Sequence, residues 1–326
     1  MFTSARFKIS IAMATFNGGK YLQNQLDTFV CQERLPDELV VCDDGSTDST
    51  LKILEIFKDS APFEVVIIKN DLTLGYTKNF EKALSACTGD LIFLSDQDDV
   101  WFPAKIAVIE QALLENPDKF LIIHDGMLVD ETLVSYGATK RGQVVAGYGS
   151  DDSLITGALT AVQRKFLPFA LPIPDAVVGH DGWLHNLSRI MGKRFVLNQS
   201  LQLIRRHTSN TSAWVASSVE PIDRFKVTKN QFLTTPATSY QDRLLYNTAL
   251  IKRLDLIGEM PGDAVFKDLI AKKHVELCNE RKVLISRQEL LSQGFIERRM
   301  TAFRMLAFGD YKYFNGLKSF IRDMLR

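Results

Sequence analysis

The sequence predicts an α/β protein, in which a mostly parallel, Rossmann-like sheet is flanked by helices and followed by a C-terminal helical region. Up to about residue 125, short apolar runs alternate with amphipathic segments, as expected of parallel strands joined by crossover helices. From about residue 239, apolar residues recur at helical spacing among many charges. A chain of 326 residues with 46% hydrophobic residues can bury a core of this size.

The expected elements follow one another in strand and helix pairs. Apolar runs bounded by turn residues predict strands at 7–14, 38–42, 64–69 and 90–95. Helical periodicity predicts helices at 19–31, 49–58, 77–87 and 103–115. Later in the chain, 240–259 and 263–291 are expected to form an antiparallel helical pair, with Pro261-Gly262 as the break between them.

Composition excludes several classes of protein. Lys plus Arg and Asp plus Glu both total 39, so no chain-wide basic field favours nucleic acid as a partner. The four cysteines lie far apart, which argues against a zinc cluster or a disulfide framework. The N-terminus lacks a signal-peptide pattern, and no run of eighteen apolar residues occurs. We therefore expect a cytoplasmic protein that does not cross a membrane.

Three of the expected strands end in polar loops. These loops are Thr15–Gly19, Asp43–Asp48 and Asp96–Asp99. Ligands of open α/β sheets bind beyond the carboxyl ends of the strands, so the three loops are expected to share one pocket.

The loop Asp96-Gln97-Asp98-Asp99 suits a divalent cation, because carboxylate oxygens are the ligands that Mg²⁺ and Mn²⁺ prefer. The alternative role of these acidic residues is to cap the helix that begins at Pro103, and we expect Asp99 to serve as that cap. The loop 43–48 allows capping by Ser46, Thr47 or Asp48, but two adjacent acids also suit a hydrogen-bond-donating ligand such as a nucleobase or ribose.

Four motifs in order resemble the donor half of the inverting family 2 glycosyltransferases, which have the GT-A fold. The motifs are 9–17, 38–48, Leu74-Gly75 with Asn79, and 88–90 leading into 96–101. The resemblance implies a glycosyltransferase domain over 1–230, with a nucleotide-sugar donor half at 1–125 and an acceptor half at 126–230. It leaves 231–326 as a helical C-terminal region.

The resemblance also implies residue roles. Asp44 would bind the base, Asp96 the ribose or metal, and Asp98 a Mg²⁺ or Mn²⁺ ion between the donor phosphates. The residues implied to bind the nucleotide sugar are Thr15, Asn17, Asp44, Gly75, Asn79, Asp96, Gly157 and Arg206.

The second half is similar to a bacterial branch of that family, often rhamnosyltransferases, that makes surface polysaccharides such as lipopolysaccharide of the cell envelope. There, 156–160 would be a strand beside the donor, and Asp181 would be the general base of inverting transfer, with His180 as a competitor. Asp181 would also cap a helix at 182–191. Gly182 departs from the aromatic residue usual in this branch, which leaves acceptor stacking open.

The segment 203–211 resembles the basic His-Asn-Thr segment of that branch. His207 would ligate the metal and Arg206 would meet phosphate, the alternative being a solvated basic turn. The resemblance implies a dTDP- or UDP-sugar donor, dTDP-L-rhamnose being favoured, and a glycan or lipid-linked oligosaccharide acceptor. Two alternatives to transfer are a catalytically inactive nucleotide-sugar-binding scaffold and a nucleotidyltransferase, for which Gly18-Gly19-Lys20 is too slight a phosphate loop.

The last segment, 295–326, combines basic and aromatic residues. It holds seven basic and three acidic side chains, a net charge of +4. This composition suits peripheral contact with the inner, anionic face of the cell membrane, or else an amphipathic cap or homodimer contact.

Overall fold

The computed structural model describes residues 6–208, 218–222, 240–314 and 316–325. The chain divides into two compact units, which are described separately. Unit 1 comprises residues 1–173 and 178–235, and unit 2 comprises 174–177 and 236–326. The boundary that the sequence predicts near residue 230 lies outside the described residues and stays a prediction.

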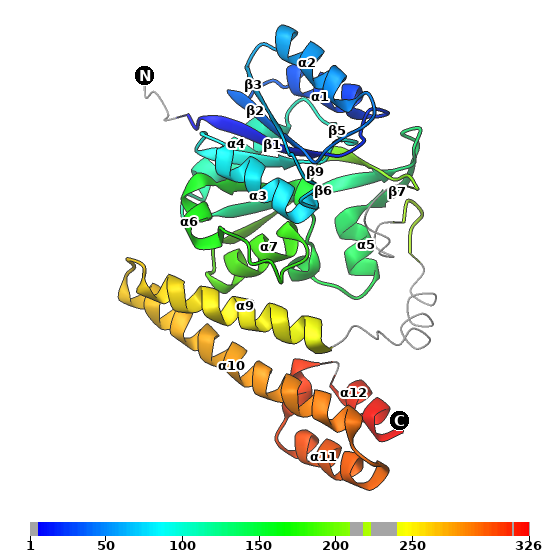
Figure 1. Cartoon of the computed structure of the whole chain (residues 1–326), viewed down its shortest axis with the longest axis vertical. Coiled ribbons are helices and arrows are strands. Elements are labelled where there is room, and N and C mark those ends of the chain that lie inside the picture. Colours follow the sequence, from blue (N-terminus) through cyan, green and yellow to red (C-terminus); the bar gives the residue numbers. More distant parts are fainter. Residues whose placement is uncertain (1–5, 209–217, 223–239, 315, 326) are drawn as a thin grey trace. The chain divides into compact units, whose positions relative to one another are not determined.

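Unit 1 is built on one mixed sheet with the strand order β3-β2-β1-β4-β8-β6-β9-β5, and β7 pairs with β6 (Figure 1). The strands are β1 (Ile9–Thr15), β2 (Glu38–Asp43), β3 (Glu64–Lys69), β4 (Leu91–Ser95), β5 (Val100–Trp101), β6 (Leu121–Val129), β7 (Ser135–Thr139), β8 (Thr160–Gln163) and β9 (Arg194–Arg205). Strands β1 to β4 are parallel to one another, whereas β8 runs antiparallel to both β4 and β6.

Helices cover both faces of this sheet. They are α1 (Leu22–Val30), α2 (Thr50–Ser60), α3 (Tyr76–Ala86), α4 (Lys105–Glu115), α5 (Lys140–Ala146), α6 (Leu167–Ala170) and α7 (His180–Ile190). One apolar cluster joins alternate residues of β1 to α1, α2 and α4. Because side chains alternate across a strand, α3, which contacts β1 and β2 but is absent from that cluster, lies on the opposite face. The predicted α/β class is confirmed.

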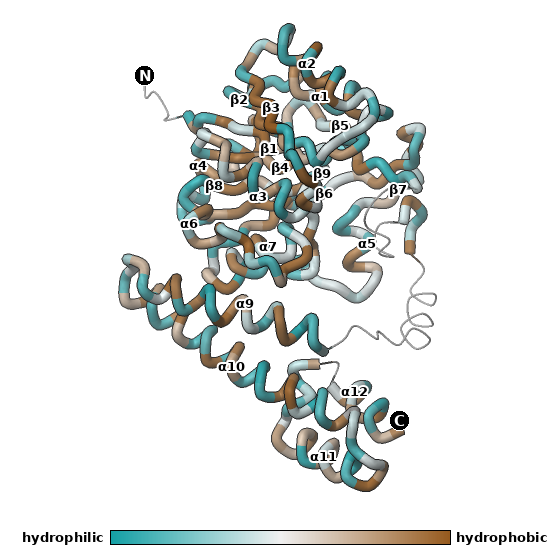
Figure 2. Tube along the Cα trace, viewed as in Figure 1, coloured by the Kyte–Doolittle hydropathy of each residue, from teal (hydrophilic) through white to brown (hydrophobic). Residues whose placement is uncertain are grey.

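The elements form where the sequence predicts them because their apolar residues match the period of the element. In β1, Ile9, Ile11 and Met13 are fully buried on one face, and Figure 2 shows hydrophobic residues concentrated in the central strands. In α1, Leu22, Leu26 and Phe29 share one buried helical face. The predicted bounds differ from the observed ones by only a few residues at each end.

The register of the sheet brings the polar loops together. Thr15 at the end of β1 pairs with Asp43 at the end of β2, and Met13 pairs with Ser95 at the end of β4. The three strands therefore end at one edge of the sheet, and the loops that follow them are neighbours there.

One predicted strand in the acceptor half is wrong. Residues 156–160 were expected to be extended, but Gly157–Leu159 form a single 3₁₀ turn, and β8 begins only at Thr160. The turn is fixed by a hydrogen bond that Leu159 N donates to the Thr156 carbonyl. It lies where β8 joins the sheet beside β4.

Unit 2 consists of helices α9 (Tyr240–Glu259), α10 (Ala264–Ser292), α11 (Phe295–Ala307) and α12 (Leu317–Leu325). The expected helical pair is present, with Asp263 capping α10 by accepting a hydrogen bond from Phe266 N. A small core joins Leu290 of α10 to Met305 of α11 and to Tyr311, which lies in a 3₁₀ turn (Asp310–Tyr313) between α11 and α12. Among the described residues, no helix is both long and apolar enough to cross a membrane.

Candidate functional site

A cavity of about 1030 Å³ opens at the edge of the sheet in unit 1 where the polar loops meet. All eleven site residues predicted from the sequence line it, although the first and the last of them, Thr15 and His207, are 192 positions apart. They are Thr15, Asn17, Asp44, Gly75, Asn79, Asp96, Asp98, Gly157, Asp181, Arg206 and His207. The structure therefore places the predicted donor residues, the acidic loop and the predicted base around one space.

The acidic loop after β4 supplies the densest group of carboxylates. Ligand atoms of Asp96, Asp98 and Asp99 lie within 4.8 Å of one another. Asp98 Oδ2 shares a hydrogen bond of 2.8 Å with His207 Nε2, so the residue after β9 reaches back to this loop. Two residues that the sequence separates by more than a hundred positions are thus in direct contact.

Asp99 does not cap a helix, contrary to the prediction. Helix α4 begins at Lys105 with Ala104 in the cap position, while Asp99 is buried and faces β9. Its Oδ2 accepts a hydrogen bond of 2.7 Å from Gln202 Nε2, and its Oδ1 accepts one of 3.2 Å from Arg205 N. Asp99 therefore fastens the acidic loop to β9, and both of its oxygens are occupied.

A buried lysine, Lys105, contacts Gln202, the residue that bonds Asp99. Lys105 is fully buried, donates hydrogen bonds to Gln202 Oε1 and the Ala158 carbonyl, and lies 3.6 Å from the centre of the Trp101 ring. Burial lowers the pKa of Lys105 well below its ordinary value, and burial with the nearby carboxylates raises the pKa of Asp99.

Asp96 is a carboxylate whose pKa lies near neutral pH. Burial, followed by the charges of Asp98 and Asp181, raises its pKa to about 7. A group with this pKa is shared between its two protonation states at neutral pH. A cation bound there would favour the charged form, because opposite charge lowers the pKa of a carboxyl group.

On the donor side, the acids after β2 are occupied by internal hydrogen bonds. Asp43 Oδ2 accepts a bond from the Thr15 hydroxyl at 2.8 Å. Asp44 Oδ1 accepts bonds from Asn70 Nδ2 at 2.9 Å and Leu74 N at 2.7 Å, and Asp44 Oδ2 accepts one from Gly75 N at 2.9 Å. The adjacent acids thus coexist because each meets several donors, and Asp44 still forms part of the cavity wall.

The candidate base stands in the first turn of α7. Asp181 was expected to cap this helix, but Gly179 occupies the cap position, with the positive φ of 96° that glycine tolerates. Asp181 Oδ1 accepts a hydrogen bond of 2.7 Å from the backbone N of Gly182. Its carboxylate is half-buried in the cavity wall.

His180, the competing base, is held in an apolar position beside Asp181. Its ring stacks on Phe80 with centroids 3.9 Å apart, and neither ring nitrogen has a hydrogen-bond partner among the described residues. Burial lowers the pKa of His180 to about 4, an effect that the charge of Asp181 only partly offsets. The imidazole is therefore neutral near pH 7 and a weak base. A side chain at Gly157 would place its Cβ 2.5 Å from Nε2 of this ring.

Several residues of the cavity wall were not predicted from the sequence, and Lys140 and Tyr21 are two of them. Lys140, at the start of α5, is buried, and burial followed by the charge of Arg206 lowers its pKa to about 8. Tyr21 packs against His207 with ring centroids 4.8 Å apart, and the Arg205 guanidinium lies 4.6 Å from its ring. Neither stands in a recognisable motif, so only the fold reveals them.

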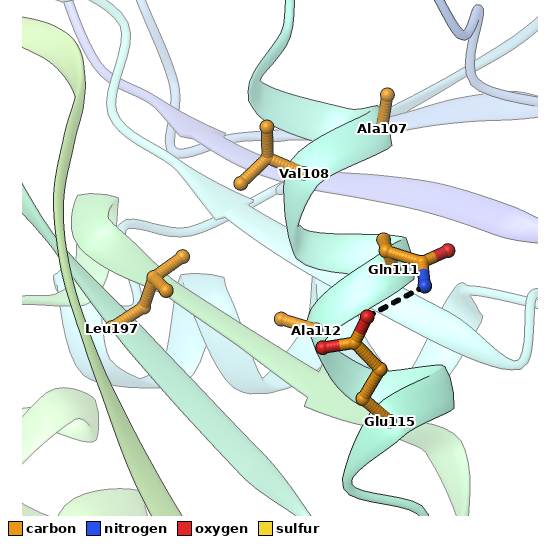
Figure 3. A pocket seen from close by; sticks show the side chains of 6 residues that line it. All are labelled: Ala107, Val108, Gln111, Ala112, Glu115 and Leu197. Carbon is orange, nitrogen blue, oxygen red and sulfur yellow. Dashed lines mark hydrogen bonds between the residues drawn. The ribbon is translucent and has the colours of Figure 1, made fainter.

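A second hollow, on the outer side of α4, offers little chemistry. It is lined by Ala107, Val108, Gln111, Ala112, Glu115 and Leu197. Figure 3 shows that its two polar side chains are engaged with each other, as Gln111 Nε2 donates a hydrogen bond of 2.8 Å to Glu115 Oε1. The cavity at the strand ends is therefore the better candidate site.

Comparison with known proteins agrees with this geometry. Residues 10–124, which are less than half of the chain, match the family model described as Glycosyl transferase family 2. A relative from Nostoc sp., an uncharacterized glycosyltransferase, is 24% identical over 222 residues, which cover 65% of this chain and 68% of the relative. The dTDP-rhamnosyl transferase RfbG of Shigella flexneri is 23% identical, with 71% of this chain and 84% of the relative covered.

Other relatives are matched over less of their length. The Escherichia coli enzyme WfgD, a UDP-Glc:α-D-GlcNAc-diphosphoundecaprenol β-1,3-glucosyltransferase, is 29% identical, with 51% of this chain and 64% of the relative covered. A Bacillus subtilis relative is covered over only 47% of its length.

Among solved structures, S. aureus TarS 1–349 in complex with UDP-GlcNAc has a TM-score of 0.53 at 14% identity. The match covers 85% of this chain and 86% of that one. At this identity the likeness shows the fold alone, which is that of the GT-A class.

Proposed function

We propose that this protein is a glycosyltransferase that moves a sugar from a nucleoside-diphosphate sugar to a glycan or lipid-linked acceptor during the synthesis of bacterial cell-surface polysaccharide. The observation that carries the proposal is the single cavity lined by all the predicted donor, metal and base residues. The match to the family 2 model at 10–124 and the names of the relatives support the same reaction class.

The acidic loop is the proposed site of a Mg²⁺ or Mn²⁺ ion. The clustered oxygen atoms of Asp96 and Asp98 fit the preference of both ions, whereas both oxygens of Asp99 are engaged with β9. His207 touches Asp98 and would complete the ligand set. When bound, the ion would neutralise the negative charge that develops on the leaving diphosphate. Arg206, half-buried in the same wall, would contact a phosphate oxygen.

Asp181 is the proposed general base of an inverting transfer. An inverting reaction needs a base that takes the proton from the acceptor hydroxyl while that oxygen attacks the anomeric carbon. Asp181 lines the cavity, and its Oδ1 accepts a hydrogen bond from the backbone N of Gly182. The neutral, apolar position of His180 makes it the weaker candidate.

The donor is proposed to be a dTDP- or UDP-sugar, and L-rhamnose is the favoured sugar. RfbG is named for dTDP-rhamnosyl transfer and WfgD for transfer from UDP-Glc, so the relatives include both nucleotides. A thermal-shift panel of UDP, dTDP and GDP, each with Mn²⁺ or Mg²⁺, would identify the nucleotide by preferential stabilisation. The corresponding nucleotide sugars, including dTDP-L-rhamnose, would then be tested for turnover.

The Asp181→Asn variant tests the mechanism. We expect it to bind the nucleotide with unchanged affinity and to lose transfer by at least about a hundredfold, because general base catalysis contributes on the order of 10²–10⁴ in rate. Asp175→Asn, which changes another carboxylate of the same part of the chain outside the cavity wall, serves as the matched control. Retained turnover in Asp181→Asn would remove the base assignment, whereas a wild-type protein that binds no nucleotide in the panel would remove the proposed function itself.

A further inference from the structure

Helices α11 and α12 of unit 2 each expose an apolar face. On α11 the exposed residues recur at positions three and four apart, and on α12 they recur every fourth position, so each set forms one stripe along its helix. Between 53% and 81% of each of these residues is exposed. These residues, called the apolar stripes below, are Ile296, Met300 and Phe303 on α11 and Leu317, Ile321 and Leu325 on α12.

Apart from Phe303, which contributes to both, the stripe residues are distinct from those that hold the two helices in the unit. Ala302 and Met305 of α11 are buried in the small core, and Asp323 of α12 is buried against α10 through its bond to Arg287. The rings of Phe303 and Phe320, 5.4 Å apart, join the two helices to each other. The buried residues of α11 and α12 therefore hold these helices in the unit, and the stripes remain exposed on the surface of the same two helices.

The charge beside the stripes is positive. Within the described part of 295–325 there are six basic and three acidic side chains. One of the acids, Asp323, is buried and bonded to Arg287, so it does not offset charge at the surface. Arg304 and Lys318 are exposed on the same two helices. Exposed apolar side chains flanked by basic ones are the composition of helices that lie in a membrane interface.

We propose that the apolar stripes and the basic side chains beside them bind the surface of an anionic lipid bilayer. With 13 and 9 residues, α11 and α12 are too short to span a bilayer, so they would lie in its interface with the stripes among the lipids. A symmetric dimer through this face would bring two basic surfaces together, which charge repulsion disfavours. The inference goes beyond the proposed function and does not depend on it, because binding to vesicles requires no sugar transfer.

The test measures co-sedimentation of the full chain with vesicles of phosphatidylcholine alone or mixed with phosphatidylglycerol. The stripe variant carries Ile296→Glu and Leu325→Glu, its two most exposed positions. The charge variant carries Arg304→Gln and Lys318→Gln. The matched control carries Val265→Glu and Val275→Glu, which are 79% and 58% exposed on α10, away from the stripes. Circular dichroism and thermal unfolding check the fold, and Met300→Glu replaces the stripe variant if that variant is unfolded.

We expect wild type and the α10 control to bind the anionic vesicles equally and the neutral vesicles weakly. The stripe variant should bind at least about tenfold more weakly, because charged side chains replace buried apolar area. The affinity of the charge variant for anionic vesicles should fall about fivefold for each positive charge removed. High salt should likewise reduce the binding of the wild-type protein to these vesicles. Wild type that fails to bind anionic vesicles, or a stripe variant that binds as the control does, would overturn the proposal. So would a wild-type dimer that forms without lipid and dissociates in the stripe variant.

Discussion

Replacing Asp44 with Asn distinguishes two possible roles of this carboxylate, which are binding the nucleobase and accepting hydrogen bonds within the protein. The sequence assigns Asp44 to the nucleobase, whereas the structure gives it three internal hydrogen bonds from Asn70, Leu74 and Gly75. An asparagine can keep its oxygen toward Asn70 and Leu74. Its amide nitrogen then faces the N–H of Gly75, and two donors cannot bond to each other.

The size of the effect follows from that one lost bond. Asp44 is only 4% exposed, so water does not replace the acceptor that Gly75 N loses. A hydrogen bond to a charged group contributes about 1.5–3 kcal/mol, and we expect the free energy of unfolding to fall by about 2 kcal/mol. For a unit of this size that corresponds to about 4–8 °C in the unfolding temperature.

Thermal unfolding of the protein without ligand measures this effect. Asp71→Asn, which changes an exposed carboxylate in the loop after β3 that also contains Asn70 and Leu74, is the matched control and should change the stability by less than about 0.5 kcal/mol. If Asp44→Asn unfolds at the wild-type temperature but loses its preference among UDP, dTDP and GDP, the carboxylate serves the ligand, and the reasoning from its internal bonds is refuted.

Three further predictions concern other contacts. His207→Ala should weaken the Mn²⁺-dependent part of nucleotide binding by about tenfold, measured by titration with and without Mn²⁺, and unchanged metal dependence would contradict its role beside Asp98. Because the pKa of Lys140 is about 8, its charge is present below pH 8 and lost above it. Nucleoside diphosphate affinity should therefore fall as pH rises through 8, and Lys140→Met should bind about tenfold more weakly without this pH dependence. Arg287→Met leaves the charge of the buried Asp323 without its cationic partner, although the Tyr311 hydroxyl still donates a hydrogen bond to it, and should cost about 3–5 kcal/mol in urea unfolding. Replacing both Arg287 and Asp323 with apolar residues should restore most of the loss.

Much of the fold and of the site's location could be predicted because they depend on local patterns. The apolar runs of β1, β2 and β4 fix where these strands end, and a parallel register puts their ends at one edge. Any polar residue that follows such a strand must then lie near the others. For this reason Thr15, Asp44 and Asp98 could be assigned to one pocket before their positions were known.

The remaining features depend on contacts between residues far apart in the chain. Asp99 has the sequence context of a helix cap, yet Gln202 from β9 gives its carboxylate a stronger set of partners. His180 is buried and neutral because it stacks on Phe80, a residue of α3 that nothing in the local sequence connects to it. Lys140 enters the cavity wall only because α5 follows β7 at that edge. No local periodicity encodes these contacts.

The position of β9 explains why the acidic loop needs the second half of unit 1. Asp99 is bonded to Gln202 and Arg205 N, Arg205 Nε donates to the Asp98 carbonyl at 2.8 Å, and His207 bonds the Asp98 side chain. The turn that would hold the cation is thus fixed at its backbone and at two side chains by one strand and the residues after it. The match to the family 2 model at 10–124 includes the carboxylates but not β9. Because an anchored ligand set loses less freedom on binding, β9 and the residues after it would contribute to the proposed cation site by holding Asp98 in place.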